Sequence, residues 1–93
     1  MEFEYDERKR ETNLEKHGVD LLLGALIFEG VTIEAPDERR AYGEKRVVAI
    51  GLVDGECFVT VYVQRGDAIR LISTRKGGRR DRQKYQEALA RGD

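Results

Sequence analysis

Two runs of alternating apolar residues around an Asp-Gly dipeptide constrain the fold of this chain more than any other feature. Residues 46–52 and 57–64 flank Asp54-Gly55, and Asp-Gly favours the type I′ turn because that turn needs positive φ at both central residues. The turn predicts an antiparallel hairpin and fixes its register. The predicted pairs are Val53 with Glu56, Ile50 with Val59, Val48 with Val61 and Arg46 with Val63.

The register divides the hairpin side chains between two faces of different character. One face is entirely apolar and is expected to pack against helices; it carries Val48, Ile50, Leu52, Cys57, Val59, Val61 and Val63. The other face combines small, hydroxyl and aromatic side chains and is expected to be open; it carries Lys45, Val47, Ala49, Gly51, Phe58, Thr60, Tyr62 and Gln64.

A third strand is predicted over residues 68–74, after a turn at Arg65-Gly66-Asp67. A two-residue turn places Arg70 on the apolar face of the hairpin, whereas a three-residue loop with a bulge places it beside Tyr62 on the other face. The sequence leaves both arrangements open.

Helix signals lie on both sides of these strands. Asp6 is a predicted N-cap for a helix over residues 7–17 that Gly18 ends, and Asp20 is a second N-cap before the apolar residues 21–28. Residues 79–91 form a third predicted helix, with an apolar stripe of Tyr85, Ala88 and Leu89.

Two short segments complete the expected order of elements. Residues 3–5 are predicted as a short strand or an anchoring arm, and residues 31–35 as a short strand before the charged loop 37–40. The fold class is therefore α+β: a single domain over residues 1–93 with two N-terminal helices, an antiparallel sheet of three to four strands and a C-terminal helix. The helices are expected on one face of the sheet.

Composition excludes several classes of function. With one cysteine, Cys57, and one histidine, His17, the chain forms no internal disulfide and no Cys/His zinc cluster. No apolar run approaches the ~20 residues that span a bilayer, and the acidic N-terminus lacks the apolar core of a signal peptide. We expect a cytoplasmic protein without a metal or a cofactor.

The charges are distributed unevenly, although the net charge is only −1. Residues 1–44 carry 6 basic and 12 acidic side chains, whereas residues 75–93 carry 7 basic and 3 acidic ones. Within residues 75–84, six basic groups face only Asp81. Because salt screens charges beyond ~8–10 Å, a polyanion responds to this local cluster rather than to the net charge. A solvated helix face is the alternative interpretation.

The side chains that could perform chemistry are mainly cations. His17 lies in the last turn of a predicted helix, where histidine more often stabilises the helix dipole than catalyses a reaction. Cleavage of RNA by its own 2′-hydroxyl needs an oriented hydroxyl, positive charge at the phosphate and a proton for the leaving oxygen. Arginine supplies the charge. Lys76 or Lys45, each beside an arginine, and Tyr85 are candidate proton carriers, although Tyr85 fits a core position equally well.

Five short motifs in this order resemble the BrnT family of toxins, within the broader RelE-like toxins. They cover nearly the whole chain: Phe3-Glu4-Tyr5-Asp6, Asn13-x-x-Lys16-His17-Gly18, Tyr42-Gly43-Glu44-x-Arg46, Arg65-Gly66-Asp67-x-Ile69-Arg70-x-Ile72-Ser73-x-Arg75-Lys76, and the basic helix that contains Tyr85. Thr74 and Gly77 stand where the family pattern usually has alanine.

The resemblance implies a RelE-like ribonuclease fold, metal-independent cleavage of RNA, inhibition of translation and neutralisation by a BrnA-like antitoxin. Carried over by order along the chain, the implied catalytic residues are Arg46, Arg75, Lys76 and Tyr85. The implied RNA-binding residues are Lys45, Arg65, Arg70, Arg79, Arg80 and Arg82.

Residues 21–28 are apolar at almost every position, and a protein partner is expected to cover whatever part of them a single sheet face does not cover. The candidate partner contacts are Leu21, Leu22, Leu26 and Ile27, in a homodimer or a heterotetramer with the antitoxin. Two other functions stay open at this point: a nucleic-acid-binding module without catalysis, and a protein-interaction module that uses the apolar segment.

Overall fold

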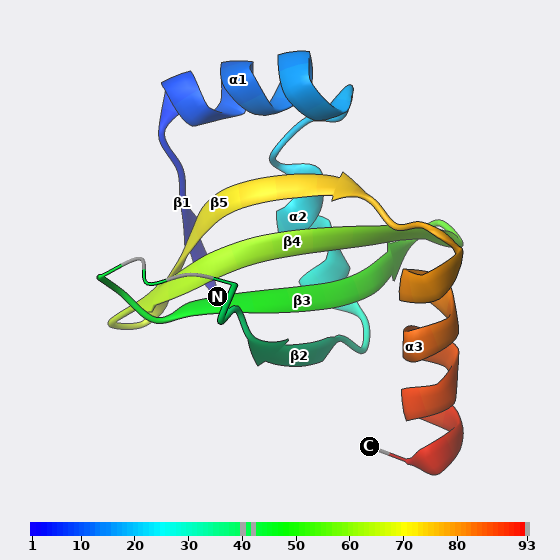
Figure 1. Cartoon of the computed structure of the whole chain (residues 1–93). Helices are drawn as coiled ribbons and strands as arrows, with labels where there is room; N and C mark the ends of the chain where they lie inside the picture. The colour runs from blue at the N-terminus through cyan, green and yellow to red at the C-terminus, as the bar shows by residue number, and fades with distance from the viewer. Residues whose placement is uncertain (40, 42, 93) are drawn as a thin grey trace.

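The chain folds around a five-stranded sheet with the strand order β1-β5-β4-β3-β2 (Figure 1). The computed structural model describes residues 1–39, 41 and 43–92; of the predicted loop and motifs, Arg40 and Tyr42 lie outside the described residues. The strands are β1 (Glu2–Glu4), β2 (Ile33–Pro36), β3 (Arg46–Val53), β4 (Glu56–Arg65) and β5 (Ala68–Lys76). The helices are α1 (Glu7–His17), α2 (Leu23–Leu26), the 3₁₀ turn η1 (Ile27–Glu29) and α3 (Arg79–Arg91).

The α+β class is confirmed, but the predicted sheet has too few strands and lacks the parallel pair. β1 pairs with β5 in parallel, so the described sheet is mixed and has five strands rather than three to four antiparallel ones. The direction of β1 was not predictable from a hairpin turn, because β1 lies at the N-terminus and its partner β5 lies more than 60 residues later in the chain. The second N-terminal helix is also shorter than residues 21–28: one turn of α2 continues into η1.

The central hairpin has the predicted register. Arg46 pairs with Val63, Ile50 with Val59 and Val53 with Glu56. The turn residues Asp54 and Gly55 have φ of 50° and 82°, as a type I′ turn requires.

The turn between β4 and β5 has two residues, Gly66-Asp67, because Arg65 pairs with Ala68. Arg70 therefore pairs with Val63 and lies on the apolar face, the first of the two predicted arrangements. A bulge follows between Val61 and Tyr62, where β5 holds one extra residue, Ile72. An extra residue reverses the alternation of side chains.

The sheet face that was predicted to be open is instead the main core. α2 and η1 cover it, and the buried side chains are Leu21, Ile27, Ala49, Phe58, Tyr62, Ile69 and Leu71. Small residues permit the close approach: a Cβ on Gly24 would collide with the hydroxyl oxygens of Thr60 and Thr74, and a Cβ on Gly51 would lie 2.8 Å from Cβ of Ile27. The small and hydroxyl side chains thus make room for α2 and η1 on the face that was expected to be open.

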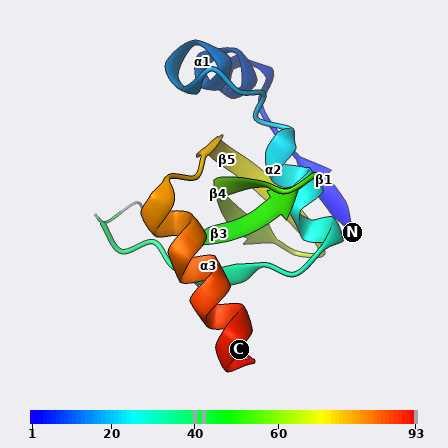
Figure 2. The same cartoon turned by 90° about the vertical axis from the view of Figure 1, so that its right-hand side faces the viewer.

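The second face packs against α3 at one end only. Ile50, Cys57 and Val59 form a smaller core there with Tyr85 of α3. Burial raises the pKa of the Cys57 thiol, and a buried thiol of this kind is unreactive. Because α2 and α3 lie on opposite sides of the sheet (Figure 2), the expectation of helices on one face is wrong.

α1 begins and ends as predicted. Asp6 Oδ1 accepts a hydrogen bond from Arg8 N, and Gly18 has a φ of 70° and donates its N–H to Leu14 O. The predicted Asp20 cap is present as well: its carboxylate accepts from Leu22 N at 3.0 Å and pairs with Arg10 through two hydrogen bonds. The hydrogen bonds from Arg10 and Leu22 lower the pKa of Asp20.

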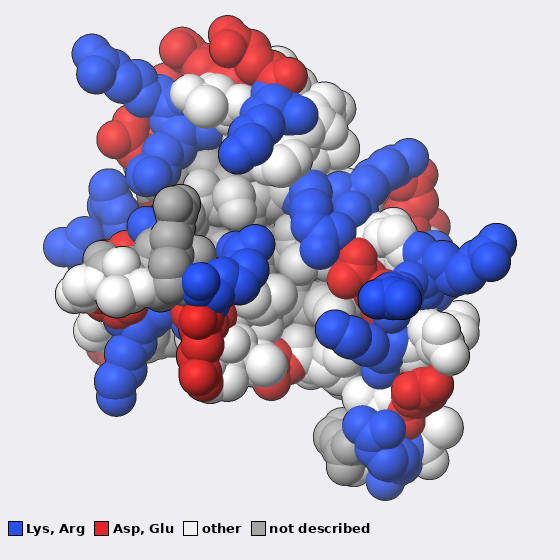
Figure 3. All heavy atoms as spheres, in the orientation of Figure 1, with Lys and Arg blue, Asp and Glu red and all other residues white. Residues whose placement is uncertain are grey.

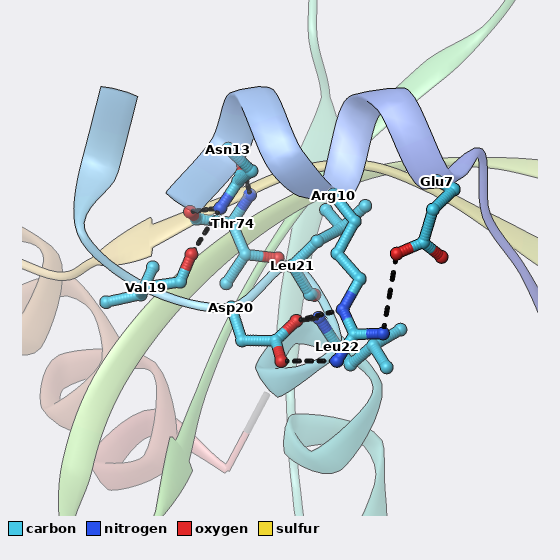
Figure 4. A network of polar contacts seen from close by, with 8 residues as sticks. All are labelled: Glu7, Arg10, Asn13, Val19, Asp20, Leu21, Leu22 and Thr74. Carbon is cyan, nitrogen blue, oxygen red and sulfur yellow. Dashed lines mark hydrogen bonds and ion pairs between the residues drawn. The ribbon is translucent and has the colours of Figure 1, made fainter. Parts of the chain in front are cut away.

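Asn13 fastens α1 to the outer edge of β5 (Figure 4). Its side-chain amide donates to Thr74 O at 2.8 Å and to Val19 O at 2.9 Å, and its Oδ1 accepts from Thr74 N at 2.8 Å. Asn13 is the only buried residue of α1. The side-chain amide thus binds both backbone groups of Thr74, as the backbone of a neighbouring strand would. It does so at a part of the β5 edge that β1 does not reach.

Among the described residues, no helix is long and apolar enough to cross a membrane.

Candidate functional site

A groove lies over the part of the second sheet face that α3 leaves uncovered. Its floor is largely apolar and consists of Val48, Ile50, Val59, Val61, Ile72 and Ser73. Residues 32–39, the C-terminal end of α1 and one side of α3 form its walls. In Figure 3 this side of the molecule has an uncharged centre, and charged side chains of both signs lie around it.

Charged side chains of both signs line the walls of the groove. The cations are Lys16, Arg39, Arg46, Arg75, Lys84 and Arg91, and the carboxylates are Glu34, Asp37, Glu38, Asp81 and Glu87. Several are paired: Arg39 Nε lies 2.7 Å from Asp37 Oδ1, and Arg46 Nε donates to Glu44 Oε2 at 3.0 Å. The groove therefore presents cations held in place by neighbouring carboxylates, over a surface that accepts apolar or aromatic groups.

The bulge at Ile72 decides which β5 side chains reach the groove. Arg70 pairs with Val63 and Arg75 with Val59, and these two β4 residues lie on the same face. Five positions separate the two arginines, so strict alternation would have placed them on opposite faces. With the bulge, Arg75 lines the groove beside Ser73.

Asp81 holds the Arg75 guanidinium at the start of α3. Arg75 Nη1 donates to Asp81 Oδ2 at 2.9 Å and to Lys76 O at 3.2 Å, and Asp81 Oδ2 also accepts from Gly78 N at 2.9 Å. The hydrogen bond from Arg75, together with the one from Gly78 N, lowers the pKa of Asp81. These hydrogen bonds hold the guanidinium toward the start of α3.

The predicted catalytic residues do not all meet in the groove. Arg46 and Arg75 line it, 29 positions apart in sequence. Lys76 pairs with Phe58 on the other sheet face, with its Nζ 3.4 Å from Glu56 Oε2. Tyr85 is buried and donates its hydroxyl to Val31 O at 2.7 Å, the core position that was its alternative interpretation.

The predicted RNA-binding residues are spread over the surface. Arg70 forms an ion pair with Glu4 at 3.9 Å, and Arg82 donates to Gly55 O at 3.0 Å. Exposed positions are occupied by Lys45, Arg65, Arg79, Arg80 and Arg82.

The predicted partner residues lie mostly inside the chain. Leu21 and Ile27 are fully buried in the core, and Leu22 packs against it. Leu26 is 42% exposed, so of these four it offers the most surface to a partner. Most of the apolar side chains in residues 21–28 thus pack against the chain's own sheet.

Residues 5–81 match the family model described as the ribonuclease toxin BrnT of type II toxin–antitoxin systems. The chain belongs to the BrnT family. It is accordingly a ribonuclease toxin, and its family implies an RNA target and an antitoxin partner. No curated protein matches the chain closely enough to add to this assignment.

Two BrnT residues with clear positions here were not selected as site residues from the sequence. Asn13 anchors α1, and His17, four residues later, lines the groove. Their spacing places both on one side of a helix, and the Asn13-x-x-Lys16-His17-Gly18 motif contained this signal. The β5 edge that Asn13 contacts is 61 residues away, which no local pattern reveals.

The lowered pKa of Asp81 predicts a pH-dependent contribution to stability. A carboxylate whose pKa is lower in the folded chain stabilises it above the ordinary carboxyl pKa and loses this effect as pH falls through the folded value. We expect Asp81→Asn to lower the free energy of unfolding most at neutral pH, with the difference from wild type shrinking in acid. Urea denaturation of both proteins between pH 7 and pH 3 measures it; a difference that does not change with pH would contradict the charge-based account.

Proposed function

We propose that this toxin cleaves RNA without a metal ion, by attack of the RNA's own 2′-hydroxyl on the adjacent phosphate, with Arg46 and Arg75 compensating the charge that develops. The observation that carries the proposal is that both arginines line one groove with an apolar floor. The groove lies over the uncovered part of the sheet face, and we propose that a single strand of RNA lies in it.

The main requirement of this reaction at the phosphate is positive charge that stabilises the transition state. The pentacoordinate transition state gathers negative charge on the non-bridging oxygens, and a guanidinium can donate two parallel hydrogen bonds to them. Arg75, fixed by Asp81, is preorganised for this role, because little reorientation is then needed during the reaction. Arginine stays protonated at neutral pH, so the proton must move through another group.

Lys76 and Tyr85 remain outside this assignment. Lys76 lies on the sheet face opposite the groove, and the Tyr85 hydroxyl is hydrogen-bonded to Val31 O inside the core. The floor of the groove, which includes Ser73, offers an apolar surface for unstacked bases, and proteins usually bind single-stranded RNA with its bases splayed out.

Purified protein incubated with single-stranded RNA in EDTA tests the proposal. We expect cleavage products with a 2′,3′-cyclic phosphate and a 5′-hydroxyl. RNA that stays intact in EDTA but is cut after Mg²⁺ is added would contradict the metal-independent mechanism.

In the cell, cleavage of RNA by this toxin is proposed to inhibit translation until a BrnA-like antitoxin binds it. The largest exposed apolar side chains of the middle of the chain, Leu26 and Val31, support contact with a partner near α2 and β2. Whether the complex is a heterotetramer follows from its mass in solution.

A further inference from the structure

The single histidine of the sequence lies in the groove that contains Arg75. His17 is the last residue of α1, is half-buried and lines the groove together with Ser73 and Arg75. Within the described ranges 1–39, 41 and 43–92, its imidazole forms no hydrogen bond and no ion pair. A residue that only stabilised the helix dipole would not need to face this groove.

Two features of α1 fix the position of His17. Asn13, one helical turn earlier, binds both backbone groups of Thr74, and Thr74 stands between the two groove residues Ser73 and Arg75. Gly18 then ends the helix in the left-handed conformation, with a φ of 70°, so the chain turns away directly after His17. The end of α1 that carries His17 is consequently held beside the segment of β5 that carries Arg75.

The carboxylates of the groove are mostly engaged elsewhere. Asp81 binds Arg75 and Gly78 N, Asp37 binds Arg39, and Glu87 accepts from Gln83. Glu34 accepts from the hydroxyls of Tyr62 and Thr32. Lysine and arginine side chains stay protonated near neutrality, whereas histidine is the side chain that most readily exchanges a proton there.

We propose that His17 is the catalytic residue that accepts the proton of the attacking 2′-hydroxyl, an inference that rests on the proposed function. The neutral imidazole takes this proton while the 2′-oxygen forms its bond to phosphorus. The bond from phosphorus to the 5′-oxygen then breaks, and that oxygen takes a proton from water. The products are a 2′,3′-cyclic phosphate and a 5′-hydroxyl, and the imidazolium returns its proton to solvent.

The test compares His17→Gln with wild type in single-turnover cleavage of RNA. Glutamine fills a similar volume and forms hydrogen bonds but does not accept a proton, so cleavage should fall about 10²–10⁴-fold, the usual contribution of a general base. Binding of a non-cleavable RNA with a 2′-deoxy sugar at the cut site should change by less than about threefold, because glutamine keeps the volume and the hydrogen-bonding groups of the side chain. Glu15→Gln, at an exposed position of the same helix outside the groove, is the matched control and should cleave as wild type does.

Chemical rescue separates proton transfer from a structural role. Imidazole added to His17→Ala should restore part of the cleavage and leave Asn13→Ala without recovery. Wild-type cleavage by His17→Gln would overturn the role of His17 while the ribonuclease proposal stands. So would parallel loss of binding and cleavage without imidazole rescue. If wild type itself left RNA intact under all conditions, the proposed function would fall first, and this inference with it.

Discussion

Replacing Arg75 by alanine should lower single-turnover cleavage of RNA by about 10²–10³-fold, the usual effect of removing one preorganised donor from a transition-state site. The guanidinium is held by Asp81 at 2.9 Å on the wall of the groove. Its positive charge therefore lies on the wall of the groove, where we propose that the phosphate binds. The fold should persist, because Asp81 still accepts from Gly78 N and caps α3 without Arg75. Rates at saturating protein, with circular dichroism of each variant, measure the effect.

The control for this variant is an exposed arginine far from the groove. Arg8 lies on α1, outside the lining residues, and Arg8→Ala should leave cleavage within about twofold, since single exposed charges contribute little. Arg75→Lys should fall between the two, because lysine keeps the charge but loses the bidentate geometry. An Arg75→Ala protein that is folded and cleaves at the wild-type rate would remove Arg75 from the mechanism.

Replacing Asn13 by alanine should lower the free energy of unfolding by about 2–4 kcal/mol. The change leaves the N–H and C=O of Thr74 without their partner in a buried place, and each such group costs about 1–3 kcal/mol. Because Asn13 also anchors the end of α1 that carries His17, cleavage should fall at temperatures where the variant is still folded. Urea denaturation gives the first quantity and single-turnover cleavage the second.

Leu14 provides the matched control for Asn13. It follows Asn13 on α1 but is 56% exposed, so Leu14→Ala should change stability by no more than about 0.5 kcal/mol, as surface substitutions usually do. Equal losses in both variants would mean that α1 is held by its general packing, and not by the amide of Asn13.

Local patterns predicted the parts of the fold whose causes are local. The Asp54-Gly55 turn set the register of β3 and β4, and Asp6 and Gly18 set the ends of α1. The faces of the sheet were assigned wrongly because alternation shows which residues share a face but not which helix covers it. Gly24 and Thr60 decide that question by allowing α2 to approach closely, a long-range effect.

The candidate site shows the same division. The cationic residues Arg46 and Arg75 were selected from the sequence and do line one groove, whereas Lys76 follows Arg75 and must point the other way. The bulge at Ile72, which brings Arg75 to the groove, depends on how β5 pairs with β4. The sequence predicts His17 only as a helix-end residue, because its place on the groove depends on the contact between residues 13 and 74, which are far apart in the chain.

A single 2′-deoxy substitution in the RNA tests the central claim most directly. A substrate that is cut at one position by wild-type protein in EDTA is prepared with deoxyribose on the 5′ side of that phosphate, which removes the attacking hydroxyl alone. Intramolecular attack predicts that cleavage at this position disappears while the modified RNA still binds and cleavage at unmodified positions continues. Cleavage at the modified phosphate at the normal rate would contradict the account, because an external nucleophile would then perform the reaction.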